Sequence, residues 1–274
     1  MTRGFVTVAT GDRHYYELAH NLLMSYHHQY QDVDRRLPWA IVAEEHNEWT
    51  ALFDKVIILN DPNHSYLDKI ELLNHCPWDE NIFIDADCLV YGDINQYFNF
   101  FPMRGVKHIG KKLPLSQNKN TGWFHKDNVD AWSSWVQFHI HSHGGIIFFN
   151  DDDLTKQVYE TCLQISPHYY EFRFAEFPHP ADEPIMALSM AVNGCEPLEP
   201  TDLEAHTLMV FFPWAKKLKA NITRHSLSYR DSNGNTYQNV MLMHWQNYNT
   251  HRAKYRRESR RLVLGTNIGG EVNC

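Results

Sequence analysis

The feature that most constrains the fold of this chain is an alternation of short apolar runs with helix-like segments over residues 1–90. The apolar runs are rich in Val, Ile, Phe and Ala and are four or five residues long, which suits strands buried on both faces. They occupy residues 5–9, 39–43, 55–59 and 81–84. We therefore expect four buried strands in this part of the chain.

The segments between these runs favour helices. Apolar residues within 14–30 recur at helical spacing, and residues 47–53 and 66–75 also suit helices. Strands separated by helices predict a parallel sheet with right-handed crossovers and with helices on both faces. Ligands of such sheets bind beyond the carboxyl ends of the strands. The residues that follow the strands at 5–9 and 81–84 are therefore expected to face one crevice.

The second half of the chain is less regular. Residues 104–130 are polar and are expected to form a long loop, a kind of segment that is often functional. A fifth buried strand is expected at 145–149 and helices at 154–165 and 184–193. An Asn-Gly turn at 231–235 predicts a hairpin, and a late strand at 240–243 leads into His244. Because no linker is visible, we expect one mixed α/β domain.

Composition excludes some classes of function. Lys and Arg number 25 against 33 Asp and Glu, so the formal charge of −8 argues against general nucleic-acid binding. No apolar run approaches the length of a membrane-spanning helix. The five cysteines form no CxxC pair, which is typical of a cytosolic, reduced protein.

Asp85 and Asp87 directly follow the strand at 81–84. Two carboxylates at one strand end repel each other unless a cation lies between them, and oxygen ligands suit Mg²⁺ or Mn²⁺. The alternative is a strand end with solvated acids. Apolar residues at 82–84 and 89–90 place the pair at the edge of a core, where unpaired charge is costly. This setting favours the metal site.

Five segments resemble those of the glycogenin-like family of retaining glycosyltransferases, in the family's order. The strand and turn at 5–12 are similar to its nucleotide-binding opening, and 82–90 to its metal-binding DxD segment. Residues 143–150, 180–185 and 241–245 resemble its Asn-x-Gly strand, its Asp-Gln segment and its late His-bearing strand. Bacterial lipooligosaccharide glycosyltransferases are the most similar in style. The resemblance implies a GT-A fold, a Rossmann-like mixed sheet with helices on both faces, in a single domain over 1–250 with a basic tail at 251–274.

The resemblance also implies roles for individual residues. Asp85, Asp87 and His244 would hold Mn²⁺ or Mg²⁺, which neutralises the diphosphate leaving group of a UDP-sugar. Asp182 and Glu183 would border the sugar and its anomeric carbon as the catalytic residues. The donor and cofactor contacts would come from Ala9, Thr10, Gly11, Lys69, Asp85, Ala86, Asp87, His143, Gly144 and Arg252. For Lys69 the alternative is a solvated helix residue.

The chain departs from the family pattern at three places. His143 stands where the family usually has Asn, and Glu183 stands where it has Gln. The family's Gly and Lys-Pro-Trp after His244 are missing, so Arg252 is the candidate substitute, since a guanidinium matches phosphate geometry. The carboxylate of Glu183 could attack the sugar or stabilise developing positive charge. Alternatively, Glu183 only begins the helix expected from residue 184.

Two further clusters allow a second interpretation. Alternating His139, His141 and His143 could chelate Zn²⁺ from one face of a strand, but no nearby Cys or carboxylate completes four ligands. The acids at 151–153 most simply cap the helix that follows. They could instead be the second acidic cluster of a haloacid-dehalogenase-like phosphatase with Asp85 as its nucleophile. That enzyme class usually has Thr or Val where this chain has Leu two residues after the second Asp.

The one basic cluster lies near the carboxyl terminus. It consists of Arg252, Lys254, Arg256, Arg257, Arg260 and Arg261. A solvated helix face and a contact with anionic lipid at the inner membrane surface are both open.

The sequence as a whole favours a cytoplasmic, metal-dependent retaining glycosyltransferase that moves a sugar from a UDP-sugar to a glycan or lipid-linked acceptor. The alternatives are the phosphatase and a nucleotide-sugar-binding protein without turnover.

Overall fold

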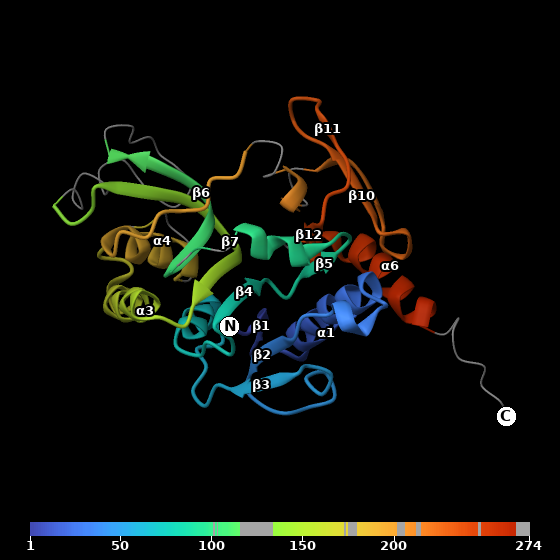
Figure 1. Cartoon of the computed structure of the whole chain (residues 1–274), viewed down its shortest axis with the longest axis horizontal. Helices are drawn as coiled ribbons and strands as arrows, with labels where there is room; N and C mark the ends of the chain where they lie inside the picture. Colours follow the sequence, from blue (N-terminus) through green and yellow to red (C-terminus); the bar gives the residue numbers. More distant parts are fainter. Residues whose placement is uncertain are drawn as a thin grey trace.

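The computed structural model describes residues 1–100, 102, 104–115, 134–172, 174, 180–201, 206–211, 215–245 and 248–266. A six-stranded sheet with the order β3-β2-β1-β4-β7-β6 forms its centre (Figure 1). The strands are β1 (Arg3–Ala9), β2 (Trp39–Ala43), β3 (Lys55–Ile58), β4 (Glu80–Ile84), β6 (Val106–Pro114) and β7 (Phe138–Asn150). Strands β1 to β4 are parallel, and β7 runs antiparallel to β4 and β6. The four strands expected before residue 90 are confirmed, and the sheet is mixed.

Helices cover both faces of this sheet, as expected. Neighbouring residues on a strand point to opposite faces. Val6 and Phe83 pack with α3 (Asp153–Ile165) and α4 (Asp182–Val192), whereas Phe5 and Ile82 pack with α1 (Arg13–Gln29). Figure 1 shows α1 on one side of the sheet and α3 and α4 on the other. The result is the α/β layering that the alternation in the sequence predicts.

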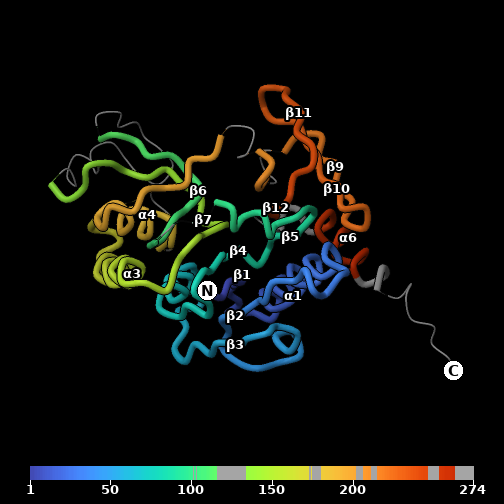
Figure 2. The backbone as a smooth tube through the Cα atoms, viewed as in Figure 1, coloured from blue at the N-terminus to red at the C-terminus, as the bar shows by residue number. Residues whose placement is uncertain are grey.

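Two small sheets lie beyond the central one. One has the order β5-β12-β8 and consists of β5 (Cys88–Val90), β12 (Leu242–His244) and β8 (Met209–Phe211). The other has the order β11-β10-β9 and consists of β9 (Lys216–Asn221), β10 (Ser226–Arg230) and β11 (Thr236–Tyr237). The hairpin turn expected at 231–235 joins β10 to β11, and Gly234 there has a φ of 91°. In Figure 2 this second sheet stands beside α6 (Tyr248–Thr266).

Two expected helices differ in kind. Residues 48–52 form turns instead of a helix. The hydroxyl of Thr50 donates to the carbonyl of Asn47, which a helix would pair with a backbone N–H, and the N–H of Phe53 donates to the carbonyl only three residues before it, that of Thr50. The segment expected at 66–75 is a 3₁₀ helix, η2 (Tyr66–Leu73), whose last turn closes with the N–H of Asn74 on the carbonyl of Glu71. The other 3₁₀ helices among the described residues are η1 (Val33–Arg35), η3 (Ile94–Phe100), η5 (Ser166–His168) and η7 (Ile222–Arg224).

The prediction of a long loop at 104–130 is wrong for the first part of that range. Residues 106–114 form β6, which pairs with β7 along its length, and β7 itself begins seven residues before the expected strand at 145–149. Both strands leave the sheet as a two-stranded ribbon (Figure 1), so charged side chains such as Lys111 and Lys112 can remain exposed on a strand. Residues 116–130 of the expected loop lie outside the described residues.

Helix α6 contains most of the basic cluster. Lys254, Arg256, Arg257 and Arg260 are exposed, and Arg261 is half-buried beside the buried Glu258. The helix packs on α1 and η7. The division into residues 1–250 and a tail at 251–274 stays a prediction, as does a contact with lipid. None of the described helices is long and apolar enough to cross a membrane.

Candidate functional site

Asp85 and Asp87 lie in the turn between β4 and β5. The apolar run of β4 ends at Ile84, and the N–H of Asp85 still continues the sheet by donating to the carbonyl of Gly145 at 3.1 Å. The N–H of Cys88 then donates to the carbonyl of Asp85 at 3.0 Å, which closes the turn. The two carboxylates remain 13% and 22% exposed. The central strand of the fold therefore presents both acids at the carboxyl edge of the sheet.

His244 reaches these acids from the far end of the chain. It pairs with Cys88 between the antiparallel strands β12 and β5, and the next N–H, that of Trp245, donates to the carbonyl of Asp87 at 3.2 Å. This pairing brings His244 Nε2 to 3.0 Å from Asp87 Oδ1 and to 3.5 Å from Asp85 Oδ2. The structure thus brings together the three residues that the sequence pointed to as metal ligands.

Lys69 joins the same cluster from η2. Its Nζ lies 2.7 Å from Asp85 Oδ1 and 3.5 Å from Asp182 Oδ2, the latter at the start of α4. The side chain is only 18% exposed, so the interpretation as a solvated lysine is wrong. One cation therefore bridges two acids from different elements.

Burial and charge act against each other in this cluster. Burial lowers the pKa of Lys69, but Asp182 and Asp85 outweigh it and the net pKa is raised, so Lys69 stays protonated. For Asp87, burial raises the pKa, but the charge of His244 outweighs it and the net pKa is lowered. For Asp182, the effect of burial exceeds the attraction of Lys69, so the net pKa is raised. For His244 the pull of Asp87 exceeds the effect of burial, and the pKa is raised.

Two glycines allow this close packing. A Cβ on Gly144 would lie 2.9 Å from Glu183 Cγ, and one on Gly145 would lie 3.1 Å from His244 Nδ1 and 3.3 Å from His143 Nδ1. The N–H of Gly144 donates to Glu183 Oε1 at 2.5 Å, and the same oxygen lies 3.4 Å from His143 Nδ1. Burial, then His244, lowers the pKa of His143 to about 2, which keeps it neutral. Glu183 is therefore fastened to the strand that carries Gly144.

The donor atoms suit a hard divalent cation. Adjacent ligands of an octahedral ion at about 2.1 Å lie about 3 Å apart, and the separations from His244 Nε2 to the two carboxylates are 3.0 and 3.5 Å. The one group of metal-binding side chains among the described residues whose ligand atoms all lie within 4.8 Å of one another consists of Asp87, Cys88 and His244. Asp85 stands beside this group and is paired through Oδ1 with Lys69 at 2.7 Å. Burial raises the pKa of the Cys88 thiol well above the usual value, and hard cations prefer carboxylate oxygens to sulfur as ligands.

The turn after β1 is held by side chains from η2 and from the residue that follows β2. Thr10 Oγ1 donates to Asp68 Oδ2 at 2.6 Å, and Gly11, with a φ of 78°, donates its N–H to Glu44. Glu44 directly follows β2 and also pairs with His64 at 3.0 Å. Sequence reasoning did not single out Glu44 or Asp68. The signal for Glu44 was available, because it stands at the carboxyl end of a predicted strand.

Other predicted residues lie apart from this cluster. Asp152 caps α3 by accepting the N–H of Thr155 at 2.8 Å, which confirms the capping interpretation. The register pairs Ile84 with Ile146 but Glu80 with Asn150, so the acids at 151–153 lie at the opposite end of β4 from Asp85. The two acidic clusters of a phosphatase therefore do not meet. The side chain of Arg252 lies outside the described residues.

The histidines of β7 do not converge on one point in the described residues. His139 is buried and His141 is exposed, whereas His143 faces Glu183. The described group of metal-binding side chains contains none of these three.

Comparison with known proteins identifies the fold. No protein-family model and no curated protein matches the chain by sequence. The galactosyltransferase LgtC, solved with donor and acceptor sugar analogs, superposes with a TM-score of 0.53 at 10% identity, covering 89% of this chain and 87% of LgtC. Mouse xyloside xylosyltransferase 1 gives 0.50 at 11% identity, covering 90% and 98%. The glycosyltransferase GlyE of Streptococcus pneumoniae gives 0.47 at 12% identity, and the 74% of this chain that matches spans only about half of that protein, 46%.

The chain therefore has a GT-A-like glycosyltransferase fold, as the resemblance in the sequence implied.

Proposed function

We propose that this chain is a metal-dependent glycosyltransferase that moves a sugar from a UDP-sugar to a glycan or lipid-linked acceptor, with retention at the anomeric carbon. The observation that carries the proposal is the convergence of Asp85, Asp87 and His244 at the carboxyl end of β4. This end of a sheet is where α/β folds bind their ligands. The similarity of the fold to that of LgtC, which was solved with donor and acceptor sugar analogs, also supports sugar transfer as the function.

Asp85, Asp87 and His244 would hold Mn²⁺ or Mg²⁺. Two carboxylates and one imidazole form a donor set that suits either ion. When bound, the ion supplies Lewis-acid stabilisation of the diphosphate leaving group. The neighbouring Lys69 is protonated and is held between Asp85 and Asp182, so it offers a second fixed positive charge for the donor.

The remaining residues would bind and orient the donor. The turn of Ala9, Thr10 and Gly11 is held in place by Asp68 and Glu44, and it would contact the nucleoside. Asp182 lies in the first turn of α4, where its carboxylate can accept sugar hydroxyl groups.

Glu183 would border the reacting carbon. Because its Oε1 accepts the N–H of Gly144, we assign Glu183 a positioning role. The acceptor would then attack the sugar from the same face as the leaving phosphate. Retention at the anomeric carbon by this route needs no covalent glycosyl-enzyme intermediate.

Release of UDP tests the proposal. UDP-glucose, UDP-galactose, UDP-xylose and UDP-N-acetylglucosamine would be incubated with the protein and oligosaccharide acceptors, with Mn²⁺ or with EDTA. We expect UDP release with at least one donor in Mn²⁺ and its loss in EDTA, and NMR of the product would report the retained anomer. The matched variants are Asp87→Asn at the site and Asp153→Asn, an exposed acid at the opposite end of the sheet.

The alternatives give different results. A binding protein without turnover would be stabilised against heat by a UDP-sugar with Mn²⁺, by about 2.7 kcal/mol at a hundred times the dissociation constant, yet would release no UDP. A phosphatase would release phosphate from a monoester and ignore UDP-sugars. Either result would refute the proposal.

A further inference from the structure

The three-stranded sheet of β9, β10 and β11 has two faces of opposite character. Leu227 and Tyr229 of β10 are only 1% and 4% exposed, in the apolar cluster that also contains residues of α6. Because neighbouring residues on a strand point to opposite faces, Ser226, Ser228 and Arg230 lie on the side turned away from that cluster. We call this side the outer face.

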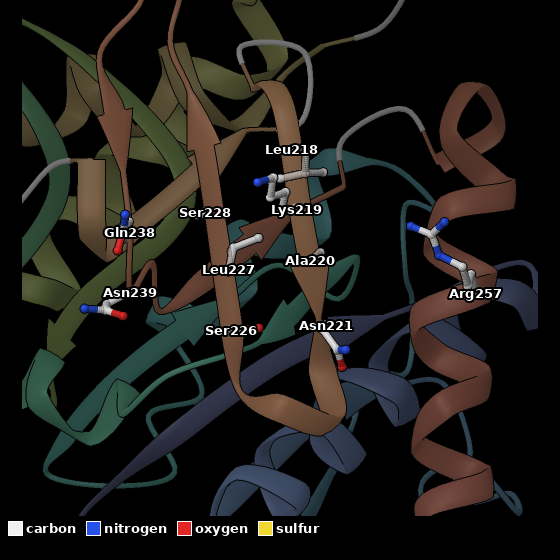
Figure 3. Close-up of a pocket in the computed structure, with 10 residues that line it drawn as sticks. All are labelled: Leu218, Lys219, Ala220, Asn221, Ser226, Leu227, Ser228, Gln238, Asn239 and Arg257. Atoms are coloured by element: carbon white, nitrogen blue, oxygen red, sulfur yellow. The ribbon is translucent and has the colours of Figure 1, made fainter.

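The strand pairing identifies the other members of the outer face, because directly paired residues share a face. The pairs are Ser226 with Asn221, Ser228 with Lys219, Arg230 with Lys216 and Arg230 with Thr236. The outer face consists of these side chains, so it carries three cations and neither an apolar nor an aromatic side chain. In Figure 3 the amine of Lys219 points away from Arg257 of α6, as its position on the outer face requires.

The positive charge of the outer face is not neutralised within the sheet. Residues 216–230 contain five of the 25 Lys and Arg of the chain and no Asp or Glu. The only carboxylate within residues 216–244 is that of Asp231, which is buried and accepts the N–H of Asn235 at 2.8 Å in the hairpin turn. Lys216, Lys219 and Arg230 are all exposed. An acidic ligand would therefore meet three cations without a competing acid in the turn.

The pairing of Lys216 with Arg230 works against folding. Like charges directly opposite each other destabilise a pair of strands. The step from Lys216 to Lys219 on β9 faces a shorter step on β10, so β9 bulges there, and Lys217 in the bulge has a φ of 49°. This left-handed conformation favours glycine and strains a lysine. Because both features cost stability, their presence together indicates that the basic row serves binding.

The neutral side chains narrow the chemistry of the ligand. The hydroxyls of Ser226, Ser228 and Thr236 and the amide of Asn221 offer the donors and acceptors that sugar hydroxyl groups need. Without an aromatic ring, the outer face lacks the stacking surface that nucleobases use, and without an apolar side chain it has nothing to insert into a lipid layer. The two rows of cations lie about 7 Å apart along the strands, so they can contact successive units of a charged chain.

We infer that the outer face binds an acidic glycan, whose anionic groups pair with Lys216, Lys219 and Arg230 and whose hydroxyls bind the neutral side chains. The choice of a glycan as the occupant rests on the proposed function, in which a glycan is the acceptor. The position of the sheet agrees with this choice. Phe211 at the end of β8 pairs with His244, and β9 begins only five residues later, at most about 18 Å along the backbone.

Titration calorimetry with octagalacturonate tests the inference, with maltooctaose as its neutral counterpart and without UDP-sugar or metal. We expect octagalacturonate to bind at least about tenfold more tightly than maltooctaose, and salt to weaken its binding because exposed charges are screened. Lys216→Gln, Lys219→Gln and Arg230→Gln should each weaken binding about fivefold, since each removes one exposed ion pair with the ligand. Lys216→Gln also relieves the repulsion with Arg230, so its melting temperature should not fall.

Matched control variants separate the outer face from general attraction to positive charge. Arg256→Gln on α6 and Lys156→Gln on α3 remove exposed cations elsewhere, and binding should change less than twofold. Equal losses in the controls, equal affinity for maltooctaose, tighter binding to octathymidylate or to phosphatidylglycerol vesicles, or a lower melting temperature of Lys216→Gln would each overturn the inference. Such results would leave UDP release at Asp85 intact, whereas loss of UDP release with glycan binding preserved would refute only the proposed transfer.

Discussion

The acid buried in α6 and the acids at the end of β4 are neutralised in different ways. Glu258 is fully buried and accepts the N–H of Ile222 at 3.0 Å, while Arg261 and Arg257 lie 2.7 and 3.5 Å from its Oε1. All three partners come from α6 itself or from the adjoining η7. These contacts fasten the helix to the body of the protein.

The site at β4 draws its charges from elements that are far apart in sequence. Lys69 comes from η2, Asp182 from α4 and His244 from β12, and they converge on Asp85 and Asp87. Both of these acids keep an exposed fraction, in contrast to Glu258. A fully buried acid whose partners come from its own helix and its neighbour stabilises the fold. A partly exposed acid whose partners come from several elements can instead give up one of these partners when a ligand binds.

Loss of the Asp87 charge should have the largest effect and act on function alone. Asp87→Asn should reduce Mn²⁺-dependent UDP release about 1,000-fold, since Lewis-acid stabilisation contributes several kcal/mol. The free energy of unfolding should change by less than about 1 kcal/mol, because the amide oxygen still faces His244 and one of two neighbouring negative charges is gone. Kinetics and urea unfolding of this variant and Asp153→Asn measure both effects. Undiminished metal-dependent turnover would remove Asp87 from the metal site.

Loss of Glu258 should act in the opposite way. Glu258→Ala leaves the buried N–H of Ile222 without its acceptor, whereas the two guanidinium groups are partly exposed and remain solvated, so the free energy of unfolding should fall by about 1–3 kcal/mol. Turnover of the folded fraction should stay unchanged. Urea unfolding provides the measurement, and Glu160→Ala, an exposed acid on α3, is the control. A change below about 1 kcal/mol would show that the contacts of Glu258 are dispensable.

His108 extends the comparison to a buried group without a counter-ion. Burial lowers its pKa to about 3, and its Nδ1 lies 3.1 Å from Ser142 Oγ. The neutral form is therefore favoured in the folded state, so its full contribution to stability is present above pH 6.5 and is lost as the pH falls from about 6.5 toward about 3.

The corresponding measurement compares urea unfolding at pH 7 and pH 5. Between these values the wild-type protein should lose about 2 kcal/mol more than His108→Asn, which cannot take up the proton. Parallel losses in the two proteins would assign the acid sensitivity to other groups.

Substitution of Glu183 by Gln should have the smallest effect on turnover. It distinguishes a residue that positions the strand at Gly144 from one that attacks the sugar. Glu183→Gln keeps an oxygen that can accept the N–H of Gly144, so turnover should fall less than about tenfold. Glu183→Ala removes that contact and should cost more. The rates of UDP release decide between the roles: a loss of about 1,000-fold in Glu183→Gln would indicate a carboxylate nucleophile instead.

The first half of the fold could be predicted because its signals are local. Strands buried on both faces read as continuous apolar runs, so β1 to β4 were recognised within one or two residues. Strand β6 was missed because it leaves the sheet, where its lysines can stay exposed and the apolar pattern is lost. The helix expected at 47–53 is replaced by turns, in which the hydroxyl of Thr50 occupies the carbonyl of Asn47.

The site could be predicted only in part. The position of Asp85 and Asp87 follows from the strand that precedes them, whereas His244 was linked to them only through the family resemblance. The bridge from Lys69 to Asp182 has no local signal, because it depends on how η2 and α4 pack.

The attachment of Asp85 to the sheet determines how the protein should respond to heat. Strand β4 is hydrogen-bonded to β1 on one side and to β7 on the other, and the N–H of Asp85 prolongs that ladder to Gly145. Amide protons in such a central strand exchange with solvent mainly through global unfolding. The acids should therefore keep their spacing until the whole sheet melts, and inactivation and loss of the β-sheet circular dichroism signal should occur at the same temperature.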